Sequence, residues 1–239
     1  MRRTGVVAIV QARMGSSRLP GKVLDTIDGV PMLGRVVERV QAATSVQSVV
    51  VATSREAADR AIVEYCQQRL PGVAVTAFGP EQDVLSRFIV AASKAPFRPS
   101  AVVRITADCP MVDPALIDQV VATFARGCDY ASNVWPVRTF PDGLDVEVIS
   151  IDRLLTMSRC ATAREDREHV TTFLHRYPYR AGVMRSVRHT EDLSAVRWTV
   201  DTADDLEFVR SVYRRFAPRR VFSWREVLAD PTCASRRVA

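Results

Sequence analysis

The stretch AIVQARMGSSRLPGKVL, residues 8–24, decides how this chain folds, because an apolar run changes abruptly into a polar loop. Residues 6–10 are apolar without alternation, and with Gln11 they are typical of a parallel strand buried on both faces. The loop behind them contains Gly15 and Gly21 and the cations Arg13, Arg18 and Lys22. A loop that follows the first strand of an open α/β sheet lies at the rim where such sheets bind ligands.

Strand and helix patterns alternate through the first half of the chain. Further strands are expected over residues 46–54, 72–78 and 101–108, and helices over residues 31–43, 55–70, 83–95 and 114–126. This alternation predicts an α/β fold with a doubly wound, mostly parallel, Rossmann-like sheet. Beyond residue 128 the regular alternation ends. We expect loop and strand over residues 129–150, a helix over 164–177, and strands over 179–188 and 196–200. A last helix is expected over 201–216, with Asp201 or Thr202 as its N-cap.

Composition narrows the class of protein. The 239 residues are 47% hydrophobic and carry a formal net charge of +6, which permits nucleic acid, a membrane surface or phosphorylated ligands as partners. The five cysteines are odd in number and form no CxxC pair, so we expect a reduced, cytoplasmic protein. No apolar stretch approaches the ~20 residues of a membrane span. Lys22 and Lys94 are the only lysines in a chain that otherwise uses arginine, so a lysine in the opening loop is notable.

The opening loop has the chemistry of a polyphosphate site. Gly15 and Gly21 let the backbone approach a ligand, successive N–H groups can form an anion cradle, and Arg13, Arg18 and Lys22 add positive charge. The loop matches neither the P-loop pattern nor the dinucleotide-binding pattern, so those two folds are not indicated.

Longer motifs carry a resemblance to a known family. ARMGSSRLPGKVL (residues 12–24) and DGVPML (residues 28–33) resemble the signature of CTP-dependent cytidylyltransferases that make CMP-sugars, the acylneuraminate and 3-deoxy-manno-octulosonate enzymes. Within that group the chain is most similar to the spore coat polysaccharide biosynthesis protein F branch. Supporting stretches are VRITADCPMVDPALID (103–118), RTFPDGLDVEVIS (138–150), REHVT (167–171) and VDTADDLEFV (200–209).

The resemblance implies an enzyme that transfers CMP from CTP to a sugar acid or related anionic acceptor, releases pyrophosphate and uses Mg²⁺. It implies nucleotide binding by Ala12, Arg13, Gly15, Ser16, Ser17, Arg18 and Lys22, and catalysis by Arg13, Lys22, Asp108 and Asp201. Asp108 and Asp201 would hold the metal, and both follow expected strands, where one or two carboxylates suffice for Mg²⁺ beside phosphate oxygens. The acceptor would be bound by Arg138, Asp145, Glu168 and His169.

The expected organisation is one nucleotidyltransferase domain over residues 1–239. Residues 1–127 would form the nucleotide-binding core, residues 128–190 a projecting β/α arm that binds the acceptor and dimerises, and residues 191–239 would complete the core. The resemblance also implies a homodimer.

Three other readings stay open. A sugar-1-phosphate nucleotidyltransferase would share the loop and the metal, and a glycosyltransferase-like protein would bind a nucleotide sugar without this chemistry. A nucleic-acid binder fits the net charge, but no basic patch carries interleaved aromatic residues, so we expect no nucleic acid and no membrane as partner.

Overall fold

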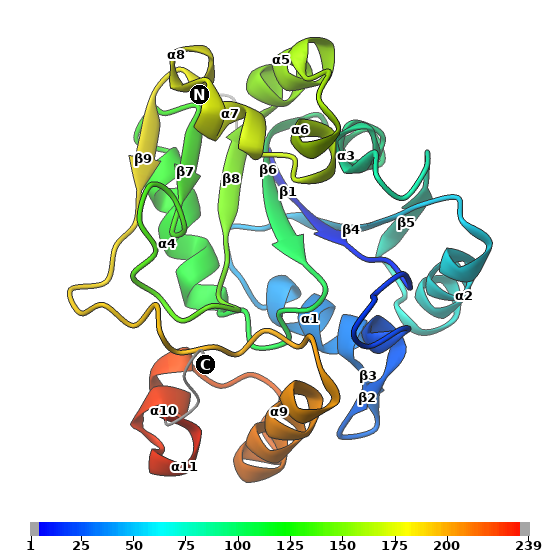
Figure 1. Ribbon diagram of the computed structural model, residues 1–239, viewed down its shortest axis with the longest axis vertical. Coiled ribbons are helices and arrows are strands. Elements are labelled where there is room, and N and C mark those ends of the chain that lie inside the picture. The colour runs from blue at the N-terminus through cyan, green and yellow to red at the C-terminus, as the bar shows by residue number, and fades with distance from the viewer. Residues whose placement is uncertain (1–4, 235–239) are drawn as a thin grey trace.

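A mixed, mostly parallel sheet organises the computed structural model, which describes residues 5–234 (Figure 1). Its central strand β1 (Gly5–Gln11) pairs in parallel with β4 (Ser48–Thr53) on one side and β6 (Pro99–Thr106) on the other. Val6, Ala8 and Val10 of β1 pack into the core on one face of the sheet. Val7 and Ile9 pack into the core on the opposite face. Burial on both faces explains why this strand is apolar at successive positions.

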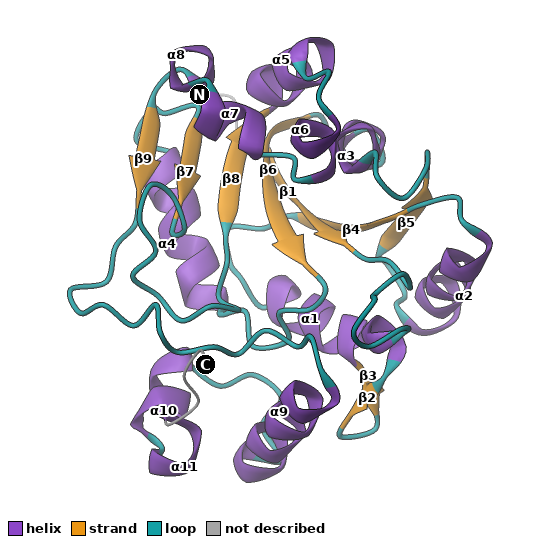
Figure 2. Cartoon of the chain, viewed as in Figure 1, coloured by secondary structure: helices purple, strands orange, loops and turns teal. Residues whose placement is uncertain are grey.

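The described part of the sheet has seven strands in the order β5-β4-β1-β6-β8-β7-β9 (Figure 2). The remaining strands are β5 (Ala74–Ala77), β7 (Tyr130–Ser132), β8 (Glu147–Ser150) and β9 (Met184–Ser186). β8 lies antiparallel to both of its neighbours, while β7 and β9 are parallel to each other. Residues 128–190, for which a projecting β/α arm is expected, therefore contribute three strands to the sheet.

Helices cover both faces. The first core is formed against α1 (Met32–Gln41), α2 (Arg60–Arg69), α4 (Pro114–Phe124), α9 (Ala203–Phe216) and α10 (Trp224–Ala229). The second core is formed against α3 (Val84–Ala92), α5 (Ile151–Cys160) and α7 (Thr172–Arg176). Short helices α6 (Arg164–Glu168), α8 (Pro178–Ala181) and α11 (Pro231–Ala234) complete the described chain. This two-sided covering confirms the expected fold class.

The expected strand–helix order through residue 126 is confirmed, with one late helix start. The expected helix over 55–70 begins as a 3₁₀ turn (Ala57–Asp59) before α2. A two-residue hairpin, β2 (Thr26–Ile27) and β3 (Val30–Pro31), turns through Asp28 and Gly29, both at positive φ. Asp-Gly is the pair that such a turn favours.

Beyond residue 128, one helix was not predicted and three predictions are wrong. Residues 151–160 form helix α5, which the sequence analysis did not expect, with Ser150 as its N-cap. The expected helix over 164–177 is broken between α6 and α7, where Val170 has φ 43°. The first part of the strand expected over 179–188 is helical. Residues 196–200 form no strand but only an isolated bridge, Asp142 to Arg197. The segment is nevertheless held by backbone hydrogen bonds to Asp142 and Asp108, and Val196, Trp198 and Val200 are buried in the core.

Among the described residues, no helix has the length and apolar character that crossing a bilayer requires. All five cysteines are free.

Candidate active site

The polar loop after β1 is fixed in place by a buried carboxylate. Asp59 accepts hydrogen bonds from the backbone N–H of Met14 (2.7 Å) and of Ser54 (3.1 Å). Gly21 has φ 75° and immediately precedes Lys22, which opens the 3₁₀ helix η1 (Lys22–Leu24). This left-handed position suits glycine and turns the chain back toward the sheet. The loop therefore presents Lys22 inward.

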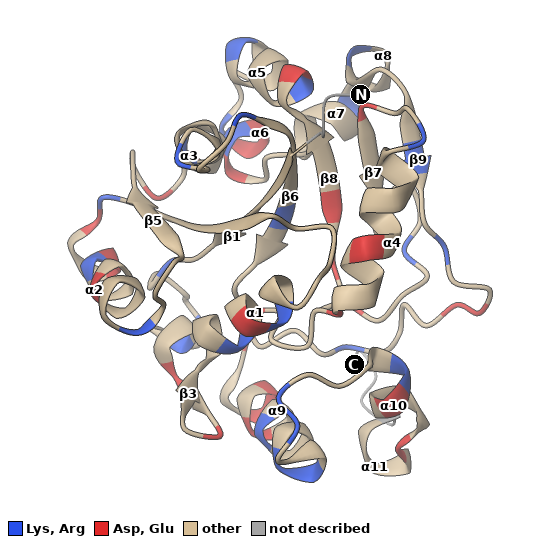
Figure 3. Ribbon diagram, turned by 180° about the vertical axis from the view of Figure 1, so that it is seen from behind, with Lys and Arg blue, Asp and Glu red and all other residues tan. Residues whose placement is uncertain are grey.

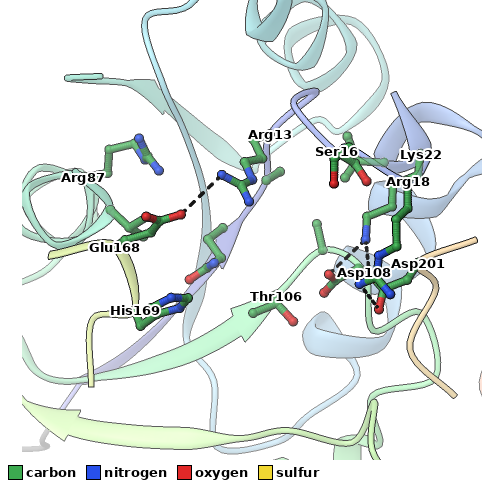
Figure 4. Close-up of a pocket in the computed structure, with 16 residues that line it drawn as sticks. Arg13, Ser16, Arg18, Lys22, Arg87, Thr106, Asp108, Glu168, His169 and Asp201 are labelled. Carbon is green, nitrogen blue, oxygen red and sulfur yellow. Dashed lines mark hydrogen bonds and ion pairs between the residues drawn. The ribbon is translucent and has the colours of Figure 1, made fainter. Parts of the chain in front are cut away.

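Lys22 joins the two carboxylates that the sequence selects as metal ligands. Its Nζ donates to Val200 O (2.7 Å), Asp201 Oδ1 (2.9 Å) and Asp108 Oδ2 (3.2 Å). The Lys22 side chain is 9% exposed, whereas Asp108 is 30% and Asp201 17% exposed. Figure 4 shows the ammonium group between the two carboxylates. Asp108 and Asp201 thus face one position, although 93 residues of sequence separate them.

Two arginines, in addition to Lys22, contact the Asp201 carboxylate. Arg18 lies 3.0 Å from its Oδ2, and Arg197 also bonds that oxygen. Partial burial raises the pKa of Asp201, but the hydrogen bond and charge of Lys22, with the charges of Arg18 and Arg197, hold that pKa below its ordinary value. Asp201 is therefore an anion at neutral pH.

The α9 N-terminus holds Asp201 in position. Asp205 accepts from the backbone N–H groups of Asp201 (2.9 Å) and Thr202 (2.8 Å), and Thr202 caps the helix in return. Of the two N-caps expected, the structure has Thr202, which leaves the Asp201 side chain to point at Lys22. Asp201 follows an extended loop instead of the expected strand.

The other end of the cavity carries a second set of opposite charges (Figure 4). Arg13 Nη1 lies 2.7 Å from Glu81 Oε1 and 3.8 Å from Glu168 Oε1. Arg87 is buried and donates to the carbonyls of Pro80 (2.6 Å) and Glu81 (2.9 Å). Its Nε is buried without a hydrogen-bond partner within the described chain. A Cβ on Gly15 would lie 2.5 Å from Glu81 Oε1, so a larger residue there would require the Glu81 carboxylate to move.

A cavity of about 250 Å³ connects these two ends. Ten of the residues selected from the sequence line it: Ala12, Arg13, Ser16, Ser17, Arg18, Lys22, Asp108, Glu168, His169 and Asp201. The sequence analysis did not select six others: Gln11, Val23, Val84, Arg87, Thr106 and Ala107.

Arg138 and Asp145 do not line this cavity. Arg138 Nη2 donates to Asp145 Oδ2 (2.8 Å), Nη1 bonds Oδ1, and Asp142 lies 3.5 Å away. The guanidinium fork is therefore closed by a carboxylate of the protein itself. Their role in binding an acceptor stays a prediction.

A polar row crosses the sheet next to the cavity, and the sequence analysis missed it. Gln11 accepts from Arg104 Nε (3.2 Å), Arg104 pairs with buried Glu147, and Glu147 accepts from Tyr130. Tyr130 also meets His175 Nε2 at 3.0 Å. The available signal was that Arg104 and Glu147 each stand directly between apolar residues, because a charge buried in a strand requires a partner.

The chemistry of Asp108 and Asp201 fits a divalent cation. The Lys22 ammonium acts as a stand-in, since it already draws both carboxylates toward a single positive charge. No cluster of three or more His, Cys, Asp or Glu able to hold a metal occurs among residues 5–234. The protein thus offers two carboxylates, which is the number Mg²⁺ uses when phosphate oxygens and water complete its shell.

Comparison with known proteins shows to which family the chain belongs. A profile of the family described as cytidylyltransferase matches residues 7–211. The spore coat polysaccharide biosynthesis protein SpsF of Bacillus subtilis is 31% identical over 246 residues, covering 98% of each chain. The 3-deoxy-manno-octulosonate cytidylyltransferase of Anaeromyxobacter dehalogenans is 35% identical over 132 residues, 55% of this chain and 52% of the relative.

Solved structures show the same fold. A cytidylyltransferase from Leptospira borgpetersenii superposes with a TM-score of 0.85 at 28% identity, over 94% of this chain and 92% of that one. A CMP:2-keto-3-deoxy-manno-octonic acid synthetase complexed with CTP superposes with a TM-score of 0.63 at 20% identity, over 89% and 99% of the two chains. With a family profile that spans most of its length, this chain belongs to the cytidylyltransferase family.

Proposed function

We propose that this protein transfers CMP from CTP to an anionic sugar acid or related acceptor and releases pyrophosphate, for glycan or polysaccharide synthesis. The observation that carries the proposal is the contact of Lys22 with both Asp108 and Asp201 beneath a basic loop. Family membership and the CTP complex named for a structural neighbour support cytidine as the base.

Asp108 and Asp201 would hold Mg²⁺, which supplies Lewis-acid polarisation of phosphate oxygens when bound. Lys22 then exchanges its carboxylate partners for the phosphates of the nucleotide. Arg13 and Arg18 are exposed enough to reach the same triphosphate, with side chains 46% and 62% exposed.

In the reaction, an acceptor oxygen forms a bond to the α-phosphorus of CTP while the bond to the bridging oxygen of the β-phosphate breaks. Negative charge grows on the departing pyrophosphate, and fixed cations stabilise that charge. Lys22 is placed for this task by the buried backbone carbonyl of Val200, which holds its ammonium at the rim of the sheet. Loss of one such donor costs about 3 kcal/mol of barrier.

Glu168 and His169 are the acceptor-side residues that face the cavity. They lie at the break between α6 and α7, across the cavity from Lys22 (Figure 4). We propose that they contact the acceptor, with the polar row from Gln11 to His175 beside them. A homodimer is part of the proposal and would show a molar mass near twice 26.6 kDa by light scattering.

The test supplies each of the four nucleoside triphosphates with panels of sugar acids and of sugar 1-phosphates, and measures pyrophosphate. A phosphodiester product formed only with CTP and a sugar acid is expected in the ³¹P spectrum. A diphosphate-linked product would instead identify a sugar-1-phosphate nucleotidyltransferase. Asp108→Asn and Asp201→Asn should each abolish turnover, while exposed Asp152→Asn should not. Full wild-type activity in EDTA would refute the metal assignment.

A further inference from the structure

A second cavity lies on the flank of the molecule, away from the nucleotide cavity. Its volume is about 460 Å³, and it opens between helix α4 and the edge strand β9. It shares no lining residue with the cavity at Lys22. Figure 3 shows β9 at the margin of the sheet beside α4, with basic segments on and after the strand. The lining residues are Gln119, Ala122, Thr123, Arg126, Arg185, Ser186, Val187 and Arg188.

Three of these residues are arginines, and none of the eight is acidic. Within the part of the chain that the structure describes, the side chains of Arg126, Arg185 and Arg188 make no ion pair and no hydrogen bond. Arg197, by contrast, is paired with three carboxylates near the nucleotide cavity. The flank cavity therefore has an uncompensated positive charge.

Nearby carboxylates are already engaged. Asp118 of α4 accepts four hydrogen bonds from Thr44 and Ser45. Asp129, before β7, pairs with Arg153 and accepts from the backbone N–H of Val183. Neither carboxylate makes an ion pair with the three guanidinium groups in the described part of the chain.

The fold itself brings the arginines together. Arg185 lies opposite Ala131 of β7, whose side chain packs into the core on the α4 side of the sheet, so Arg185 faces α4. Arg126 follows the last turn of α4, on the same helical face as Gln119 and Thr123. Arg188 lies two residues after the end of the edge strand and is the third arginine of the cavity.

The other lining groups define the ligand class. Gln119 and Ser186 add neutral hydrogen-bond donors, whereas the Thr123 hydroxyl donates to the backbone carbonyl of Gln119. The lining includes no aromatic side chain that could stack on a base. Guanidinium groups bind phosphate oxygens through paired N–H donors. We propose that the α4/β9 cavity is a second, non-catalytic site for a small, multiply charged phosphate anion, for which pyrophosphate is the simplest probe.

Isothermal titration with pyrophosphate in metal-free buffer tests this. The variant R126Q/R185Q/R188Q should bind one equivalent fewer than the wild type, or bind it at least ~10-fold more weakly. The matched control R98Q/R159Q/R214Q removes three other exposed arginines and the same net charge, and should keep the wild-type isotherm. Lys22→Met should also keep this binding event, which separates the site from the nucleotide cavity.

Equal loss in the control variant would show nonspecific charge attraction and overturn the proposal, as would an unchanged isotherm in R126Q/R185Q/R188Q. Arg185→Glu alone, which leaves α4 untouched, provides a second variant should the triple substitution unfold. Binding of the protein to vesicles of phosphatidylcholine with phosphatidic acid is measured in parallel. Binding to those vesicles without binding to pyrophosphate would contradict a site for a soluble anion.

Discussion

Replacing Lys22 by methionine should increase the affinity of the nucleotide-free protein for a divalent cation. The ammonium group occupies the position between Asp108 and Asp201 with contacts of 3.2 and 2.9 Å. A metal ion that uses both carboxylates must displace it. Methionine keeps most of the side-chain volume and removes the charge, so the carboxylates become available without that competition.

The size of the effect follows from these two contacts. Each charge-assisted hydrogen bond contributes about 1.5 kcal/mol at the low end, or about 3 kcal/mol together. Asp108 is 30% exposed, and water screens its contact. Discounting by half leaves about 1.5 kcal/mol, which corresponds to ~10-fold tighter binding.

Mn²⁺ titration followed by electron paramagnetic resonance measures this affinity directly, without activity. Lys22→Met should also gain more thermal stability from Mn²⁺ than the wild type, because a ligand that binds only the folded state stabilises it. Lys94→Met is the matched control, since Lys94 is the other lysine and is exposed. Lys22→Met should also lose CTP turnover. Mn²⁺ binding no tighter in Lys22→Met than in the wild type would refute the competition.

Three further predictions concern the supports of the site and the fold. Asp59→Ala removes the acceptor for the Met14 N–H and should raise KM for CTP while costing about 1–3 kcal/mol of stability, measured by steady-state kinetics and urea unfolding. Burial raises the pKa of Asp205, but its backbone and side-chain hydrogen bonds outweigh that effect and lower the pKa to about 2. The Asp205 carboxylate therefore stabilises the fold at pH values above its unfolded pKa, and this contribution is lost as pH falls through about 2. Asp205→Asn should therefore lose about 1–2 kcal/mol at neutral pH, and the urea-unfolding curves of variant and wild type should converge in acid; a constant gap would contradict this. Gly143→Ala places a Cβ 2.8 Å from backbone atoms and should lower Tm far more than Gly72→Ala. Gly72 also has a positive φ, but a Cβ there would meet no atom within 4 Å. Equal decreases in Tm would show that the positive φ alone determines the cost.

The first half of the fold could be predicted because its signals are local. The unbroken apolar run of β1 reflects burial on both faces, and the glycines and cations behind it mark the rim of a parallel sheet. Lys22 could be selected because it is one of two lysines in an arginine-rich chain.

Beyond residue 128 the tertiary context decides the structure. Helix α5 had a local signal, the Ser150 cap with Leu154 and Met157 on one face, which the sequence analysis did not use. Residues 196–200 look like a strand because Val196, Trp198 and Val200 are buried in the core at alternate positions. Their backbone bonds only to Asp142 and Asp108 and forms no continuous ladder, which depends on distant segments and leaves no local signal.

The site was predicted by residue type, but its pairings were not. Arg138 was expected to hold an acidic ligand, and the structure shows the fork already closed on Asp145. Arg87 escaped selection because its role depends on the carbonyls of Pro80 and Glu81, and backbone acceptors leave no mark in a sequence.

The ion pairs at the two ends of the cavity have one property in common. Lys22 and Arg18 face Asp201, and Arg13 faces Glu81 and Glu168, so each cation of the loop meets a carboxylate of the protein. A polyphosphate without a metal ion would take the cations away from these carboxylates and leave the carboxylates unpaired. An unpaired, partly buried carboxylate costs free energy. A metal–nucleotide complex brings a cation for the carboxylates and anions for the loop at the same time. The geometry therefore favours the complex over either component, and we expect CTP and the divalent cation to raise each other's affinity by the same factor, as linkage requires.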